Sequence, residues 1–193
     1  MSPEETRTDH SSRPPAARLF FALWPPHEQA ARLADKASIA AGMLGGRPTR
    51  IETIHLTLAF LGETVTARLP ELHALANGIK GESFAITIDR FGYWRHNHLF
   101  WAGCSKPPEQ LFDLYGRLQV ALADSKFPID PPIQAFTPHL TLLRKVPICT
   151  TIAGLDFPVT ERLTWLCDRF VLVQSESLFG KHRYQMLGEY LLA

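Results

Sequence analysis

Two segments of the chain contain the same four residues, His-Leu-Thr-Leu, beginning at His55 and at His139. Neighbouring side chains of an extended strand point to opposite faces. Each copy therefore places its histidine and its threonine, Thr57 or Thr141, on one face and its leucines on the other. A repeated tetrapeptide alone is weak evidence in a leucine-rich chain, because such repeats arise by chance. The shared pattern of faces is stronger evidence that the two strands meet at one polar site.

Two imidazoles and two hydroxyls around one pocket suit the cleavage of a phosphodiester by general acid–base catalysis. A neutral imidazole accepts a proton from water while a protonated one donates to the leaving alkoxide, and both states exist near neutral pH. Within each copy the imidazole and the hydroxyl lie about 7 Å apart along the strand, which lets both contact one small anion. Thr57 and Thr141 would donate to the non-bridging phosphate oxygens, where charge develops in the transition state. This chemistry requires neither a metal ion nor a cofactor.

Three other interpretations stay open at this point. A histidine on the polar face of a strand is commonly a solvated or hydrogen-bonded surface residue. His96 and His98, in the segment "HNH", resemble a metal-binding pair, and together with His55 and His139 they would make a metallophosphoesterase. The segment has no carboxylate or cysteine close by, so a solvated turn is the simpler explanation. A non-catalytic module would use the same pocket to hold the phosphate of a nucleotide.

The segments around the two copies predict the elements that must position them. Apolar residues recur at helical spacing in three segments punctuated by prolines and glycines, at residues 26–42, 69–79 and 106–125. Short or alternating apolar runs predict strands, at residues 18–24, 53–60, 83–89, 98–103, 139–142, 165–175 and 183–192. We expect the strands at 83–89 and 98–103 to pair as an antiparallel hairpin. This order of elements predicts an α+β protein with two similar lobes.

Composition limits the class of protein. The chain has 193 residues, 46% of them hydrophobic and 20% charged, which fits a single two-lobed globular domain over residues 18–193. We interpret the polar residues 1–17 as a flexible tail. The net charge of +1 excludes a global basic field, so a polyanion must be met locally. Three widely spaced cysteines predict neither a disulfide framework nor a thiolate zinc site. No segment has the apolar length of a signal peptide or a membrane span, and we expect a cytoplasmic monomer.

At these motifs the sequence resembles the two-histidine (2H) phosphoesterase superfamily and, within it, the RNA 2′,3′-cyclic phosphodiesterases, also called 2′-5′ RNA ligase-like proteins. The segments that carry the resemblance are "RLFFAL", "HLTLAFLGE", "FTPHLTLLRK" and the closing "LVQS" and "YQML", which span residues 18–192. The resemblance implies a bilobal α+β fold. It implies two mainly antiparallel sheets with helices on their outer faces, arranged with a pseudo-twofold axis around a central cleft.

The resemblance also implies an activity. Members hydrolyse the 2′,3′-cyclic phosphate at the 3′ end of RNA, or of a cyclic nucleotide, to a 2′-phosphomonoester without a metal or other cofactor. His55 and His139 match the catalytic positions, and Thr57 and Thr141 the phosphate-binding ones. The sequence does not say which histidine is the acid; our working assignment is His55 as acid and His139 as base. The reverse reaction, 2′-5′ ligation, stays an alternative.

Arg144 lies five residues after His139, where the resemblance implies an arginine that binds the phosphate. Strict alternation places Arg144 on the opposite face of the strand from His139. Either the strand ends or bulges near Leu143, which we favour, or Arg144 is a surface charge.

Aromatic side chains near the cleft would stack on the base, because such stacking tolerates any base. Phe21 is the candidate that fits the family pattern best, and a place in the hydrophobic core is an equal alternative for it. Phe136 and Trp94 are lesser candidates for stacking. Arg47 and Arg50 are candidates for contact with the RNA backbone.

Overall fold

The computed structural model describes residues 14–127, 136–147, 161–178 and 181–193. Most of the tail predicted at residues 1–17, and Cys149, lie outside the described residues. The helices are α1 (His27–Leu44), α2 (Leu69–Gly78) and α3 (Glu109–Asp124), with short 3-10 turns at Ile51–Thr53 and Thr66–Arg68. The strands are β1 (Ala16–Leu23), β2 (Arg47–Pro48), β3 (Leu56–Val65), β4 (Phe84–Ile88), β5 (Arg90–Trp94), β6 (Leu99–Gly103), β7 (His139–Arg144), β8 (Leu163–Cys167), β9 (Arg169–Leu178) and β10 (Lys181–Leu191).

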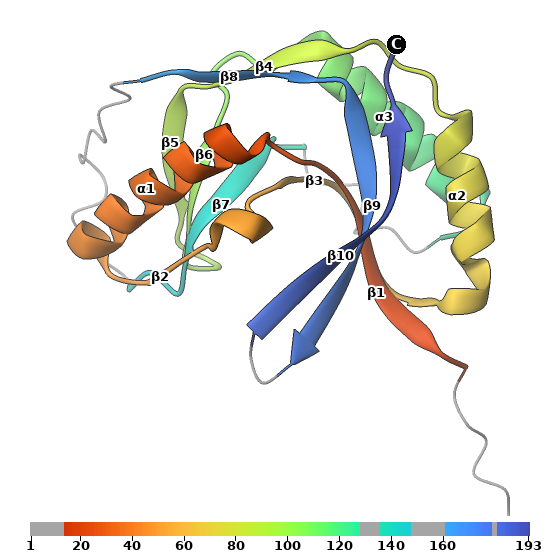
Figure 1. Ribbon diagram of the computed structural model, residues 1–193, viewed down its shortest axis with the longest axis horizontal. Coiled ribbons are helices and arrows are strands. Elements are labelled where there is room, and N and C mark those ends of the chain that lie inside the picture. Colours follow the sequence, from red (N-terminus) through yellow and green to blue (C-terminus); the bar gives the residue numbers. More distant parts are fainter. Residues whose placement is uncertain (1–13, 128–135, 148–160, 179–180) are drawn as a thin grey trace, which may run out of the picture.

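Eight of these strands form one antiparallel sheet whose two halves barely touch. The order is β10-β9-β1-β3-β7-β6-β5, and the short β2 pairs with β7. At the centre of the sheet, β3 and β7 pair through a single residue couple, Leu56 with Leu140. Each half therefore forms its own curved layer, and Figure 1 shows the two layers diverging from the middle of the molecule. The predicted α+β class with antiparallel sheets is confirmed.

The buried faces of the helices share one hydrophobic core with the leucines of β3 and β7. Apolar residues at helical spacing form the buried stripe of α1, and α3 has a similar stripe of leucines. The buried residues of these stripes are Ala30, Leu33, Ala37, Ala40, Leu44, Leu111, Leu114, Leu118 and Leu122. α1 follows β1 in the chain but packs against β7 of the other half, while α3 follows β6 and packs against β3. This exchange joins both halves to one hydrophobic core. In the described part of the chain, no helix is long and apolar enough to cross a lipid bilayer.

The predicted hairpin is wrong in its first strand. β4, predicted to pair with residues 98–103, pairs instead with β8 in a separate two-stranded sheet. The partner of β6 across the turn is β5, which the sequence analysis did not predict. The chain changes sheets at Asp89, whose carboxylate accepts hydrogen bonds from the backbone N–H and the hydroxyl of Ser105, both at 2.6 Å. A second predicted strand, at 165–175, is also interrupted, because β8 ends at Cys167 and β9 begins at Arg169.

Candidate active site

The two His-Leu-Thr-Leu segments lie side by side where β3 and β7 touch. The antiparallel pairing of Leu56 with Leu140 sets His55 across from Thr141 and Thr57 across from His139. A local twofold axis through this pair relates the two copies, because residues 84 positions apart in sequence correspond to each other across it (140 − 56 = 84). The leucines of both copies are buried, while the histidines and threonines are only partly buried on the other face. The predicted division of faces is therefore confirmed.

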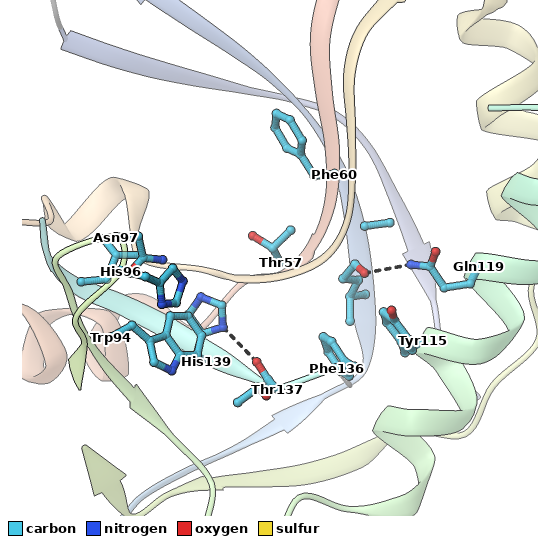
Figure 2. A pocket seen from close by; sticks show the side chains of 13 residues that line it. Thr57, Phe60, Trp94, His96, Asn97, Tyr115, Gln119, Phe136, Thr137 and His139 are labelled. Atoms are coloured by element: carbon cyan, nitrogen blue, oxygen red, sulfur yellow. Dashed lines mark hydrogen bonds between the residues drawn. The ribbon is translucent and has the colours of Figure 1, made fainter. Parts of the chain in front are cut away.

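Both imidazoles are held in the same tautomer by the same kind of hydrogen bond. Nδ1 of His55 lies 2.8 Å from the carbonyl oxygen of Thr53, and Nδ1 of His139 lies 2.9 Å from that of Thr137. A carbonyl oxygen only accepts, so each Nδ1 carries the hydrogen and donates it. Figure 2 shows this bond for His139. In the neutral state each Nε2 therefore has the lone pair that acid–base chemistry needs.

Three aromatic rings surround His55. The ring of Trp24 stacks on the imidazole with centroids 5.1 Å apart and planes 11° apart. Phe20 lies at 4.8 Å, and Tyr184 meets the imidazole edge-on at 5.3 Å. Burial in this cage lowers the pKa of His55 to about 4, against the opposing effect of its bond to the Thr53 carbonyl. An imidazole with this pKa is neutral across the physiological range.

His139 has a more open environment. Its aromatic contact is Trp94, which meets the ring edge-on with centroids 4.5 Å apart. Burial lowers the pKa of His139, its hydrogen bond to the Thr137 carbonyl opposes this, and the charge of Arg144 lowers the pKa further. Both histidines are thus harder to protonate in the folded protein than in solution.

A bulge in β7 brings Arg144 to the histidine face. In the pairing of β6 with β7, Trp101 faces Thr141 whereas the preceding residue, Phe100, faces Leu143, so Leu142 is an extra residue. The extra residue reverses the alternation, and the predicted bulge near Leu143 is confirmed. Arg144 is exposed, and its positive charge lowers the pKa of both catalytic-candidate histidines. The guanidinium of Arg144 is therefore close enough to His55 and His139 to act on both electrostatically.

A cavity of about 670 Å³ opens beside this centre, in the wedge between the diverging strands β3 and β7. Thr57 and His139 lie on its inner wall, and Trp94 and Phe136 also line it. Figure 2 shows these side chains around the cavity, from β3, from the end of β5, from the start of β7 and from the segment that leads into β7. His139 thus borders a space large enough for a nucleotide-sized ligand, whereas His55, Thr141 and Arg144 are not among the residues that line it.

Comparison with known proteins supports the interpretation of this region as an active site. Residues 23–101 match the model of the family described as LigT like Phosphoesterase. The RNA 2′,3′-cyclic phosphodiesterase of Escherichia coli is 33% identical over 176 residues, which are 91% of this chain and 96% of that protein. The chain belongs to this family. Among solved structures, E. coli LigT in apo form matches with a TM-score of 0.78 and 32% identity over 92% of this chain and 98% of LigT. E. coli LigT complexed with 3′-AMP matches with a TM-score of 0.80 and 31% identity over 92% and 99%.

The prediction that Phe21 stacks on a base is wrong. Phe21 is fully buried in the main core, where its ring contacts Phe170 and Tyr190. Its neighbour Phe20 points to the opposite face of β1 and contacts His55 instead. Strand alternation accounts for the difference, because Phe21 shares a face with the buried Leu19. Phe136, by contrast, lines the cavity.

The "HNH" segment forms the turn between β5 and β6. Nδ1 of His98 donates to the carbonyl oxygen of Val146 at 3.1 Å, whereas His96 is exposed and lines the outer part of the cavity. Among the described residues, no group of three or more His, Cys, Asp or Glu side chains is placed to hold one metal ion. Arg47, predicted to meet the RNA backbone, lies opposite Arg144 in the β2–β7 pairing and is exposed. Arg50 is also exposed, just before the first motif.

Several residues of the site escaped sequence reasoning. Trp24 follows the end of β1, and Tyr184 lies on the last strand, yet both contact His55. Tyr115 and Gln119 are half-buried residues of α3 that line the cavity. Helical periodicity identifies the buried face of α3 but does not say that its other face borders a ligand cavity. The register of β9 and β10 beside β1 brings Tyr184 into place, and no local sequence signal encodes that register.

Proposed function

We propose that this protein hydrolyses the 2′,3′-cyclic phosphate at an RNA 3′ end or on a nucleotide to a 2′-phosphomonoester, without a metal ion, by acid–base catalysis with His55 and His139. The observation that carries the proposal is the matched pair of imidazoles. Each donates Nδ1–H to the carbonyl of the residue two positions earlier and keeps Nε2 for proton transfer, next to the threonine of the other motif. The family membership and the activity named for the E. coli relative support it.

The reaction needs one proton accepted and one proton donated. Nε2 of the base takes a proton from water as the water oxygen bonds to phosphorus opposite the 3′ oxygen. The P–O3′ bond breaks, and Nε2–H of the acid protonates the departing O3′, leaving the phosphate on O2′. The protonated base and the deprotonated acid then exchange a proton through solvent. The paired arrangement of His55 and His139 supplies one imidazole for each end of this in-line path.

The phosphate itself would be held by Thr57, Thr141 and Arg144. The two hydroxyls donate hydrogen bonds to the non-bridging oxygens, and the guanidinium neutralises charge that grows as the phosphodiester becomes a phosphomonoester. Because the cyclic substrate is an anion, its binding raises the pKa of both histidines and opposes the effect of Arg144. The proton that the acid donates is therefore taken up together with the substrate. Among the aromatic residues that the sequence predicts to stack on the base, Phe136 is the candidate for contact with it.

The test compares purified wild-type protein with the His55→Ala and His139→Ala variants on adenosine 2′,3′-cyclic phosphate and on an RNA with a 2′,3′-cyclic end. We expect each variant to lose about a hundredfold or more in kcat, the scale of losing a general acid or base. A matched control replaces the exposed His27 at the start of α1. Near-normal turnover by a folded His55 or His139 variant would refute the mechanism.

Three further measurements separate the rival functions. EDTA leaves the rate unchanged if no metal takes part and abolishes it for a metallophosphoesterase. A binding module returns the cyclic nucleotide intact, and a ligase joins it to an added 5′-hydroxyl RNA. Adenosine 3′,5′-cyclic phosphate should not be opened, and the product should carry only a 2′-phosphate.

The acid and the base are distinguished by the leaving group. A substrate with sulfur in place of the bridging 3′ oxygen releases a thiolate, which needs no proton. The variant that lacks the acid should regain most of its rate on this substrate, whereas the variant that lacks the base should not. Under the working assignment, His55→Ala is the rescued variant.

A further inference from the structure

The direction of the Arg144 side chain depends on its backbone. In the described part of the chain, no carboxylate forms an ion pair with Arg144, and the side chain is exposed. Its cross-strand neighbour in β2 is Arg47, which has the same charge and cannot hold the guanidinium in place. A side chain without a partner is directed first by the backbone from which it starts. The contacts that fix the backbone around Arg144 are therefore part of the phosphate site.

This backbone lies between two irregular residues of the chain. Before Arg144, Leu142 is the extra residue of the bulge in β7. After it, Lys145 has a φ of 56°, in the left-handed region that residues with a Cβ rarely adopt. Regular strand pairing cannot by itself fix a segment that departs from it on both sides of one residue. Other contacts must hold the end of β7.

The turn between β5 and β6 supplies those contacts through His98. The backbone N–H of Val146 donates to the carbonyl oxygen of His98 at 3.1 Å, and Nδ1 of His98 donates to the carbonyl oxygen of Val146, also at 3.1 Å. The hydroxyl of Tyr93 in β5 donates to the same oxygen at 3.4 Å. The side chain of Val146 is fully buried in the main core. The residue two positions after Arg144 is thus fixed by packing and by His98 together.

On the other side of β7, the segment of β2 holds the chain only as far as Arg144. The backbone N–H of Thr49 donates to the carbonyl oxygen of Leu142 at 2.8 Å. Gly46 has a φ of 91°, and a Cβ on it would lie 3.0 Å from the carbonyl oxygen of Arg144. This close approach positions the bulge and the arginine backbone. It leaves the course of the chain after Arg144 to the bonds with His98.

His98 makes these bonds from an unfavourable backbone conformation. Its φ is 56°, and among the described residues only Lys126 and Lys145 share a positive φ without being glycine. Such conformations persist where the surrounding structure requires them, and they gather at functional sites. Glycine or asparagine is the ordinary choice at a left-handed turn position. Histidine adds a donor that glycine lacks, and here that donor meets the carbonyl of Val146.

We propose that His98 is a positioning residue for Arg144: by binding Val146 it fixes the end of β7 and directs the guanidinium to the phosphate of the substrate. The inference rests on the proposed function. It gives a role to the second histidine of the "HNH" segment that requires neither a metal ion nor proton transfer. His98 is not among the residues that line the cavity, so it acts only through the backbone.

The experiment titrates inorganic phosphate into the wild type, Arg144→Gln, His98→Gly and the double variant by calorimetry. Glycine accepts a positive φ, so His98→Gly removes the imidazole donor without straining the turn. We expect His98→Gly to weaken phosphate binding by about 2- to 12-fold, the range for one hydrogen bond. Adding it to Arg144→Gln should cause no further loss, because both changes act through one guanidinium.

A second readout is the pH profile of kcat/KM, which a purely structural role would not move. The charge of Arg144 lowers the pKa of both His55 and His139. A displaced guanidinium lowers them less, so both limbs should move to higher pH in His98→Gly, in the same direction as in Arg144→Gln.

Two control variants bracket His98→Gly. His98→Asn tolerates the left-handed conformation and keeps a side-chain N–H donor, so it should bind phosphate as the wild type does. Lys126→Gly places glycine at another left-handed position, which is exposed, and should also match the wild type. The assignment is overturned if folded His98→Gly has wild-type affinity and unmoved limbs, if its loss is equally large in the Arg144→Gln background, or if His98→Asn loses as much as His98→Gly. Should His98→Gly not fold, His98→Ala is measured under the same criteria.

The phosphate titration separates this inference from the proposed function, because it needs no turnover. A wild type that binds phosphate but opens no cyclic phosphate refutes the hydrolysis, and the titrations still decide the role of His98. A wild type that turns over the cyclic substrate while His98→Gly behaves identically refutes only the positioning role. Phosphate binding that is absent in the wild type or unchanged in Arg144→Gln also overturns the inference, because Arg144 then holds no phosphate.

Discussion

Mild acid should destabilise this protein through His55. The pKa of His55 is about 4 in the folded protein and 6.5 in an unstructured chain, because burial among aromatic rings disfavours the imidazolium. Above the unfolded value both states are neutral, and the folded state has its full stability. As the pH falls from the unfolded towards the folded value, the unfolded chain binds a proton that the folded protein does not. Linkage then lowers the free energy of unfolding by about 2 kcal/mol at about pH 5, with a limit of about 3 kcal/mol below the folded pKa.

The assay is urea unfolding, followed by circular dichroism, at several values between about pH 8 and pH 5, above the range in which unperturbed carboxylates titrate. His139 has a lowered pKa and contributes with the same sign. The contribution of His55 is therefore isolated by the His55→Gln variant, whose loss of stability over this interval should be smaller than that of the wild type by about 2 kcal/mol. His27→Gln, at an exposed position, is the control and should behave as the wild type. An equal pH dependence in the His55→Gln and wild-type proteins would refute the cage as the cause.

Three further outcomes follow from the geometry of the site. Replacing Trp24, which stacks on His55, by leucine admits water to the imidazole and raises its pKa, so the limb of the kcat/KM profile that His55 sets should move to higher pH; two unmoved limbs would contradict this. Arg144→Gln removes a cation that lowers the pKa of both histidines, so both limbs should move to higher pH, and the affinity for inorganic phosphate should fall by about tenfold or more. Thr57→Val and Thr141→Val should each lower kcat by about tenfold or more with unchanged limbs, because a hydroxyl donor to the phosphate is lost without a change of charge; a shifted limb would show that the threonines act on the imidazoles instead.

The pattern of faces in the two motifs was predictable because alternation is a local property of a strand. It correctly placed both histidines and both threonines on one face and the leucines in the core. Strict alternation predicts the wrong face for Arg144, because the extra residue Leu142 reverses the alternation within three positions of His139. A bulge was expected there only because the arginine would otherwise point away. Alternation thus indicated where the strand must be irregular, and the pairing of β6 with β7 shows that the irregularity is a bulge.

Contacts between distant segments were not predictable in the same way. Phe20 and Phe21 are adjacent aromatics in an apolar run, and only the packing of β1 between β3 and β9 decides which of them faces the site. The hairpin failed for a related reason. β4 has an alternating pattern that suits any antiparallel partner, and its partner β8 lies far along the chain. Periodicity specifies which face of a strand is buried but does not specify its neighbour.

The backbone of the site is nearly symmetric, but its surroundings are not, and the difference bears on the product. A symmetric site would accept a cyclic phosphate in two orientations related by the twofold axis. In one orientation the leaving oxygen faces His55, and in the other it faces His139. Here Phe20, Trp24 and Tyr184 occupy the space beside His55, whereas the corresponding region beside His139 opens into the cavity. The described cavity therefore offers room for a nucleoside beside His139. In the proposed mechanism a fixed nucleoside would fix which ester oxygen is aligned with the attacking water, so we expect the asymmetry of the aromatic residues, rather than the histidines themselves, to select a single phosphomonoester as product.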